Sequence, residues 1–195
     1  MNSTDIARLV REARSCRRFV EAERIPAEFL LELVDVARVC PSSRNQQALR
    51  FMVLSSEAEC ARVFPFMKWA AALDWKGPQP GERATGYILF LKPTGAQTAH
   101  DSGIVGMAMK LAAAAEGWAS VMLGGLDRAG LHRELGLPAD MEIDIAIAFG
   151  RAGESVVIEP LKTGTSVAYW HGTDGAHHVP KLSLGDLLYP ARNQD

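Results

Sequence analysis

The order of short apolar runs and helical patterns is what most constrains the fold of this chain. Residues 86–91, 119–123 and 143–149 are short, apolar and adjoin glycine, which is typical of buried strands. Another strand is predicted at residues 50–54. With the helices between them, the predicted order is helix, helix, strand, helix, strand, helix, strand, helix, strand. No glycine-rich fingerprint follows the first strand, so a Rossmann nucleotide site is not predicted.

Apolar side chains at helical spacing define the helices, and their ends carry recognisable signals. Ser3 or Thr4 is expected to cap the first helix, and Pro41 ends the second. Gly103, Gly106 and the alanines that follow imply that the fourth helix packs closely against another backbone. The helices are predicted at residues 3–14, 25–40, 57–73 with a break at Pro65, 100–116 and 127–135.

After Arg151 the sequence predicts no long helix. It indicates a strand at residues 166–170, a hairpin-type turn at 172–175, a returning strand at 176–180 and a short helix at 184–188.

The composition is that of an ordinary soluble protein. The chain has 195 residues, 48% of them hydrophobic, and a formal net charge of −2, so a single domain over residues 1–195 is expected. A nucleic-acid-binding domain would usually be basic, and no apolar run reaches the roughly 20 residues that span a bilayer. Three widely spaced cysteines, Cys16, Cys40 and Cys60, favour reduced thiols and a cytoplasmic location.

The segment Arg14-Ser15-Cys16-Arg17-Arg18-Phe19 concentrates polar groups at the exit of the first helix. In an extended segment alternate side chains share a face, so Ser15 and Arg17 could point together. Guanidinium forks and a hydroxyl can then meet a phosphate or another planar acceptor. The alternative is a solvated cluster at a helix C-terminus, where cations suit the helix dipole.

Four polar islands interrupt the apolar framework, and together they suit one kind of ligand. They are residues 14–18, 41–47, 123–125 and 177–181. They contain no acidic pair for glycosidase chemistry and no Gly-x-Ser-x-Gly elbow. They offer cations, hydroxyls, amides and backbone N–H groups, which suit an anionic cofactor held at several edges.

Several single residues have a structural and a functional interpretation. His171, His177 and His178 could suggest a metal site, but adjacent histidines point to opposite sides of a strand and no carboxylate cluster accompanies them, so none is predicted. Cys16 between arginines could be a reactive thiol, although a small packed residue is favoured. Asp101 is expected to cap a helix rather than to act as an acid.

The ordered set of motifs resembles the FMN-dependent nitroreductase family. Arg14-Ser15-x-Arg17-x-Phe19 is followed by Pro41-Ser42-Ser43-x-Asn45-x-Gln47, then by a long alanine-rich helix opened by Asp101-x-Gly103. A strand into Leu123-Gly124-Gly125 comes next, then Leu135-Gly136-Leu137-Pro138 and a strand that ends in Gly150. The tail His178-Val179-Pro180-Lys181 is similar to one compact branch of the family.

The resemblance implies an α+β fold with a central, mainly antiparallel sheet flanked by helices, in an intertwined homodimer with FMN at the interface. It implies that Arg14, Ser15 and Lys181 hold phosphate or ribityl oxygens and that Arg17 lies near flavin N1 and O2. Pro41, Ser42, Ser43 and Asn45 would come from the partner chain and cover the ring, supported by Gln47. The backbone of Leu123, Gly124 and Gly125 would approach the N5 edge. Ala13 and Leu182 stand where many family members carry cations.

The activity implied is electron transfer from NADH or NADPH to a nitroaromatic, quinone or similar organic acceptor, by a ping-pong mechanism in the cytoplasm. No side chain need act as a proton donor or nucleophile, because the flavin does the chemistry. Two alternatives remain open: another flavin reduction on the same fold, such as dehalogenation or ene reduction, and a non-enzymatic flavin or phosphate-ligand binder. No nucleic-acid or membrane partner is expected.

Overall fold

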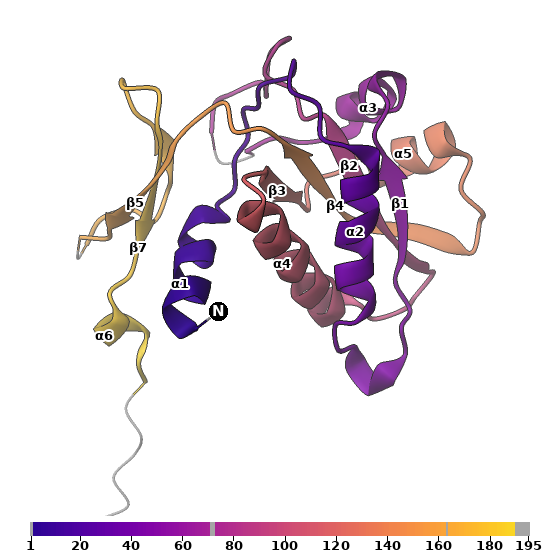
Figure 1. Cartoon of the computed structure of the whole chain (residues 1–195), viewed down its shortest axis with the longest axis horizontal. Helices are drawn as coiled ribbons and strands as arrows, with labels where there is room; N and C mark the ends of the chain where they lie inside the picture. The colour runs from indigo at the N-terminus through magenta and orange to yellow at the C-terminus, as the bar shows by residue number, and fades with distance from the viewer. Residues whose placement is uncertain (1, 71–72, 163, 190–195) are drawn as a thin grey trace, which may run out of the picture.

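A computed structural model describes residues 2–70, 73–162 and 164–189, and its centre is a four-stranded sheet (Figure 1). The strands are β1 (Arg50–Leu54), β2 (Gly86–Pro93), β3 (Ala119–Leu123) and β4 (Met141–Gly150), in the order β1-β2-β4-β3. Every neighbouring pair in this sheet is antiparallel. The predicted strands and the antiparallel sheet are therefore confirmed.

Helices cover both faces of the sheet, and strand β2 shows why. Ile88 and Phe90 pack with α2 (Ala27–Arg38) and α4 (Ala99–Ala115) on one face. Tyr87 and Leu89 contribute to the core on the other face, beneath α3 (Glu57–Val63), the 3₁₀ turn η2 (Phe64–Phe66) and α5 (Arg128–Leu135). Because side chains alternate along a strand, an uninterrupted apolar run is what a strand covered on both faces requires.

The helix boundaries correct two of the sequence expectations. Helix α1 (Ser3–Glu12) is capped by Asn2 rather than by Ser3 or Thr4, since the Asn2 carboxamide oxygen accepts from the backbone N of Thr4 at 2.9 Å and of Asp5 at 3.1 Å. The helix expected at 57–73 ends at Val63, and Pro65 lies in the 3₁₀ turn that follows. Part of its remainder, residues 71–72, lies outside the described residues.

The glycines of α4 also differ from expectation. A Cβ at Gly106 would collide with the Met122 side chain of β3, and one at Gly103 would meet nothing within 4 Å. Within the described residues, the close contact found at these two glycines of α4 is therefore with a methionine side chain. In the described part of the chain, no helix combines the length and apolarity needed to cross a membrane.

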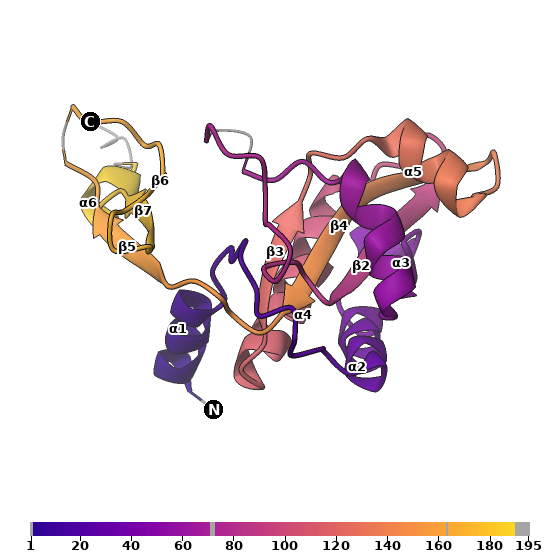
Figure 2. The same ribbon diagram turned by 90° about the horizontal axis from the view of Figure 1, so that it is seen from above.

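The described residues from Ser155 to Tyr189, here called the arm, form a second small sheet that stands apart from the main one on the side of α1 (Figures 1 and 2). The arm contains β5 (Val156–Pro160), β6 (Trp170–His171), β7 (His177–Lys181) and α6 (Leu184–Leu187). Strand β7 pairs parallel with β5 and antiparallel with β6. The predicted hairpin is confirmed, the predicted strand at 166–170 is wrong except at Trp170, and β5 was not predicted.

Many apolar side chains of the arm face solvent in the single chain. Val167 is 71% exposed and Leu184 is 73% exposed, although both belong to residue types that are usually buried. The other exposed large apolar side chains of the arm are Ile158, Trp170, Leu182, Leu187, Leu188 and Tyr189. Such a surface is typical of a segment that docks on another chain.

Candidate functional site

The segment Arg14–Phe19, here called the strap, is not helical and is fixed by backbone hydrogen bonds at several points. The Cys16 amide donates to the Ser120 carbonyl of β3 at 3.1 Å, and the Phe19 amide donates to the Glu82 carbonyl at 2.9 Å. The Gly153 amide donates to the Arg18 carbonyl at 2.8 Å. The strap therefore lies between the start of β3, the exit of β4 and the loop before β2.

Glu154 holds the middle of the strap from the other side. Its side chain is only 1% exposed, and one carboxylate oxygen accepts from the backbone N of Arg17 at 2.5 Å and of Arg18 at 3.2 Å. A buried carboxylate is stable only with such donors. Sequence reasoning missed Glu154 because it lies in a polar turn with no periodic pattern.

The side chain of Arg17 joins the strap to the arm. Its NH1 group donates to the Ser15 carbonyl at 3.3 Å and lies 3.0 Å from Nε2 of His177. The guanidinium also lies over the Tyr169 ring, 4.9 Å from its centroid. Among the residues that the structure describes, no hydrogen-bond partner is found for the other N–H groups of Arg17.

His177 is neutral in this arrangement, and its tautomer follows from its neighbour. Burial, and then the positive charge of Arg17, lower the pKa of His177 to about 4. Because a guanidinium can only donate, Nε2 of His177 accepts and Nδ1 carries the hydrogen. The ring is therefore a neutral acceptor that orients Arg17.

The histidine neighbourhood corrects one premise of the sequence analysis. Potential ligand atoms of Glu154, His171 and His177 lie within 4.8 Å of one another, so a carboxylate does accompany the histidines. His178 lies apart from them and contacts Glu159 at 2.8 Å, which confirms that adjacent histidines diverge. Within the described residues, Oε2 of Glu154, Nε2 of His171 and Nδ1 of His177 are buried and have no hydrogen-bond partner, and Nε2 of His171 lies 3.5 Å from Oε2 of Glu154.

Cys16 is a buried structural residue, as favoured from the sequence. It is 3% exposed, and its thiol donates to the Arg18 carbonyl at 3.0 Å. Burial, and to a smaller extent the Glu154 charge, raise the pKa of Cys16 to about 11. A thiol with such a pKa is not a reactive nucleophile at neutral pH.

The second island lies in a loop that is tied to the start of α4. The Ser43 amide donates to the Asp101 carboxylate at 2.9 Å, so Asp101 anchors the loop, and the N-cap of α4 is Thr98. Arg44, Asn45 and Gln47 have φ values of 52°, 53° and 48°, in the left-handed region. Non-glycine residues in that region are strained and gather at ligand-binding segments.

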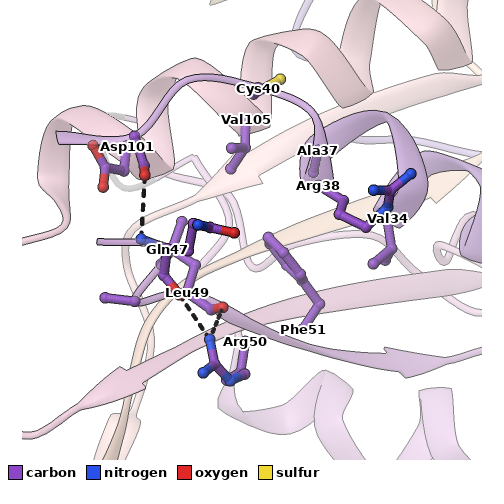
Figure 3. Close-up of a pocket in the computed structure, with 12 residues that line it drawn as sticks. Val34, Ala37, Arg38, Cys40, Gln47, Leu49, Arg50, Phe51, Asp101 and Val105 are labelled. Carbon is purple, nitrogen blue, oxygen red and sulfur yellow. Dashed lines mark hydrogen bonds between the residues drawn. The ribbon is translucent and has the colours of Figure 1, made fainter. Parts of the chain in front are cut away.

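A pocket of about 290 Å³ opens between this loop, α2, β1 and α4 (Figure 3). Figure 3 shows the Arg50 side chain below it, where NH1 donates to the carbonyls of Gln47 and Leu49, each at 2.8 Å. The residues that line this pocket are Val34, Ala37, Arg38, Cys40, Ser42, Gln47, Ala48, Leu49, Arg50, Phe51, Asp101 and Val105.

The third island, residues 123–125, and the fourth island, residues 177–181, lie in different parts of the structure. Leu123 is buried at the end of β3, the Gly124 carbonyl accepts from Arg128 at 3.1 Å, and the Gly125 carbonyl accepts from the Lys68 amide at 2.9 Å. Lys181 ends β7 with its side chain exposed. His177, at the other end of β7, brings the fourth island to the strap through its contact with Arg17.

Helix α4 separates the first two islands. The loop 41–47 contacts Asp101 in its first turn, and the strap lies near Lys110 in its second half. At 1.5 Å per residue these two positions are about 14 Å apart along the helix. One chain therefore does not bring the strap and the loop to the same place.

The chain has an antiparallel sheet with helices on both faces and a strap rich in cations at the edge of that sheet. Comparison with known protein families identifies this fold class. The sequence model of the Nitroreductase family matches residues 10–85 and 92–151. The chain belongs to the nitroreductase family.

Solved structures of the same family share the fold at low sequence identity. A nitroreductase family protein from Clostridium difficile 630 is 24% identical, with a TM-score of 0.62 over 79% of this chain and 86% of that chain. An FMN-dependent nitroreductase from Clostridium difficile R20291 is 18% identical, with a TM-score of 0.59 over 75% and 87%. Nitroreductase A from Vibrio parahaemolyticus is 21% identical, with a TM-score of 0.62 over 79% and 69%. The α+β nitroreductase-like fold is thus confirmed.

Proposed function

We propose that the protein is an FMN-dependent oxidoreductase that takes electrons from NADH or NADPH and passes them to a nitroaromatic, quinone or similar organic acceptor by a ping-pong mechanism. The observation that carries this proposal is the strap, which presents fixed arginines on a nitroreductase core. The solved relative from Clostridium difficile R20291 is described as FMN-dependent.

The groups on the strap fit FMN chemically. The Nε atom of Arg14 is buried and, within the described ranges, has no hydrogen-bond partner, and Arg17 offers further N–H groups. Such donors suit phosphate and carbonyl oxygens. In this proposal Arg14, Ser15 and Lys181 hold the phosphate or ribityl chain, Arg17 faces N1 and O2, and the backbone of residues 123–125 approaches N5.

Bound FMN would supply the electron transfer itself, and the side chains would bind and orient. The charge of Arg17 would favour the negative charge that reduction places at N1 and O2, while His177 and the Ser15 carbonyl hold its guanidinium in place. No side chain is proposed as a proton donor or nucleophile.

The loop 41–47 is proposed to serve the site of the partner chain in a homodimer. Its distance from the strap along α4 supports this arrangement, because a site that uses Arg17 together with Ser42, Ser43 and Asn45 then needs two chains. The exposed apolar side chains of the arm offer a surface for the same interface.

Sedimentation of the flavin-loaded protein at micromolar concentration is expected to show a dimer, with twice the 21.2 kDa of one chain. Obligate dimers of this kind bury more than about 2,000 Å², which keeps them assembled at such concentrations. A flavin-bound monomer would contradict the shared site.

The activity is tested by anaerobic reduction. The purified protein is expected to absorb in the flavin bands, to bleach with NADH or NADPH, and to recover its colour when a nitroaromatic or quinone is added. Parallel double-reciprocal plots would support a ping-pong mechanism, and plots that intersect would contradict it. Colour that no nucleotide bleaches would favour a flavin binder without this activity, and recovery only with a halogenated or enone acceptor would favour the alternative reductions.

A further inference from the structure

Three side chains meet where the arm joins the main fold, and each brings a buried atom without a partner. Glu154 directly precedes the arm, and His171 and His177 lie on β6 and β7. The Glu154 side chain is 1% exposed and His177 is fully buried. In the part of the chain that the structure describes, Oε2 of Glu154, Nε2 of His171 and Nδ1 of His177 have no hydrogen-bond partner. Because buried polar atoms are nearly always satisfied, these three atoms point to a shared ligand.

The backbone of the arm fixes the three side chains relative to one another. His171 and His177 are register partners in the antiparallel pair of β6 and β7, so their side chains lie on the same face of the small sheet. Their ring centroids are 5.0 Å apart. The His177 amide donates to the Ser155 carbonyl at 2.8 Å, which holds β7 beside the residue that follows Glu154. Strand pairing therefore creates the cluster.

The carboxylate of Glu154 is engaged on one side only. Its Oε1 accepts from the backbone N of Arg17 and Arg18, whereas Oε2 lies 3.5 Å from Nε2 of His171. Two ligands of one tetrahedral zinc ion, with bonds of about 2.0–2.2 Å, lie about 3.4 Å apart. Glu154 and His171 already have the spacing of two metal ligands, and His177 offers a third ligand atom within 4.8 Å of both.

We propose that Glu154, His171 and His177 bind one divalent transition-metal ion, of the class of Zn²⁺, through Oε2, Nε2 and Nδ1. One carboxylate and two imidazoles are a ligand set that zinc accepts. The ion ties the arm, which supplies both histidines, to Glu154 and through Glu154 to the strap amides. The inference does not depend on FMN, so it stands or falls separately from the proposed function.

The ion and Arg17 compete for His177. Nε2 of His177 accepts from NH1 of Arg17 at 3.0 Å, which leaves the hydrogen on Nδ1. When the ion binds Nδ1, that proton leaves and Nε2 takes one up, so the ring stays neutral and becomes a donor at Nε2. Arg17, which can only donate, then loses this contact and keeps the Ser15 carbonyl. Metal binding thereby releases the residue that the proposed function places beside the flavin.

The test is a titration of tag-free, chelator-treated protein with Zn²⁺ in competition with a chromophoric chelator. The wild type is expected to bind one Zn²⁺ per chain. Glu154→Gln, which keeps an oxygen for the strap amides, and His171→Gln should each lose affinity about a hundredfold or more, because even groups that only orient a metal ligand contribute 10–100-fold. Co²⁺ should show visible d–d bands in the wild type and not in these two variants.

His178→Gln is the matched control. His178 follows His177 in the chain, but it contacts Glu159 at 2.8 Å and Asp174 at 3.4 Å, outside the cluster. Its variant should bind Zn²⁺ within about twofold of the wild type, because His178 neither ligates the ion nor orients a ligand. Zn²⁺ should raise the melting temperature of the wild type and of this control, but not of the two ligand variants, since an ion that binds only the folded chain stabilises it.

Arg17→Gln tests the choice of Nδ1 as the ligand atom. The carboxamide oxygen of glutamine can accept from Nε2–H of His177, which a guanidinium cannot do. Zn²⁺ should therefore bind this variant about tenfold more tightly than the wild type, as expected when a ligand gains an orienting acceptor. Equal or weaker binding would contradict the assignment of Nδ1.

Two results would overturn the site as a whole. One is a folded wild type that binds no stoichiometric Zn²⁺, and the other is Zn²⁺ binding that persists unchanged in both Glu154→Gln and His171→Gln. Either result leaves the proposed function intact, because the flavin is not needed for this site. A protein that binds Zn²⁺ as expected but takes up no FMN would instead refute the proposed function and leave the metal site standing.

Discussion

Replacement of Arg14 by alanine is expected to weaken FMN binding about 30-fold, which corresponds to about 2 kcal/mol for a charge-assisted contact that is partly buried. Arg14 is half-buried, and its Nε has no partner in the part of the chain that the structure describes. Its removal should therefore take away a ligand contact without breaking a hydrogen bond of the protein. Equilibrium dialysis or flavin fluorescence would measure the change.

Arg62→Ala is the control, because Arg62 is an exposed cation that pairs with Glu134 at 2.8 Å, far along the chain from the strap. Loss of equal size in both variants would mean that the strap is only a solvated surface. Arg17→Gln provides a contrast: FMN should be retained better, and the flavin midpoint potential should fall by about 30 mV if about 1.4 kcal/mol of charge stabilisation is lost. An unchanged midpoint would show that Arg17 does not face the ring.

Gly153→Ala is expected to have the largest effect on stability. A Cβ at Gly153 would lie 2.8 Å from the carbonyl carbon and 2.9 Å from the carbonyl oxygen of Phe19, atoms that belong to the backbone of the strap. A side-chain tip could rotate away, but the strap is held by Ser120, Glu82 and Glu154. Overpacking of this kind costs about 1–3 kcal/mol.

Thermal unfolding at a fixed protein concentration should show a melting temperature lower by several degrees, at about 2–4 °C per kcal/mol for a chain of this size. Gly185→Ala serves as the control, since the added Cβ meets only the Ser183 hydroxyl at 3.7 Å and the backbone there is not left-handed. That variant should melt within a degree of the wild type. Equal melting temperatures of the two variants would mean that the backbone at Phe19 can shift to accommodate a Cβ at Gly153.

The main sheet and its helices could be predicted because their signals are local. Residues 86–91 are apolar at every position, and the structure covers them on both faces. Strand β5 could not be predicted, because it pairs with β7 across the intervening residues 161–176 and lies in an arm whose exposed pattern shows no buried face. Propensity describes such a strand poorly, since pairing decides its conformation.

In the candidate site, too, the features with local sequence signals could be predicted and those that depend on tertiary contacts could not. The polar segment 14–18 and the polar loop 41–47 could be recognised from the sequence, but Glu154, the burial of Lys110 and the Arg17–His177 contact depend on tertiary placement. The sequence does show Lys110 inside an alanine-rich helical pattern. A charged residue at an apolar position of such a pattern is the signal that could have indicated that Lys110 is buried. The roles of the site residues, the single domain and the cytoplasmic location remain predictions.

The hydrogen bonds of the strap also determine how a ligand is met. Cys16, Arg17, Arg18 and Phe19 each bind the rest of the chain through a backbone group, so the strap is already rigid when it presents Arg14 and Arg17. A mobile loop would lose conformational entropy at the moment of binding, which weakens association. Here that entropy is lost during folding, so the strap is preorganised for an anion. Binding should therefore show little heat-capacity change beyond that of the surface that the ligand itself covers.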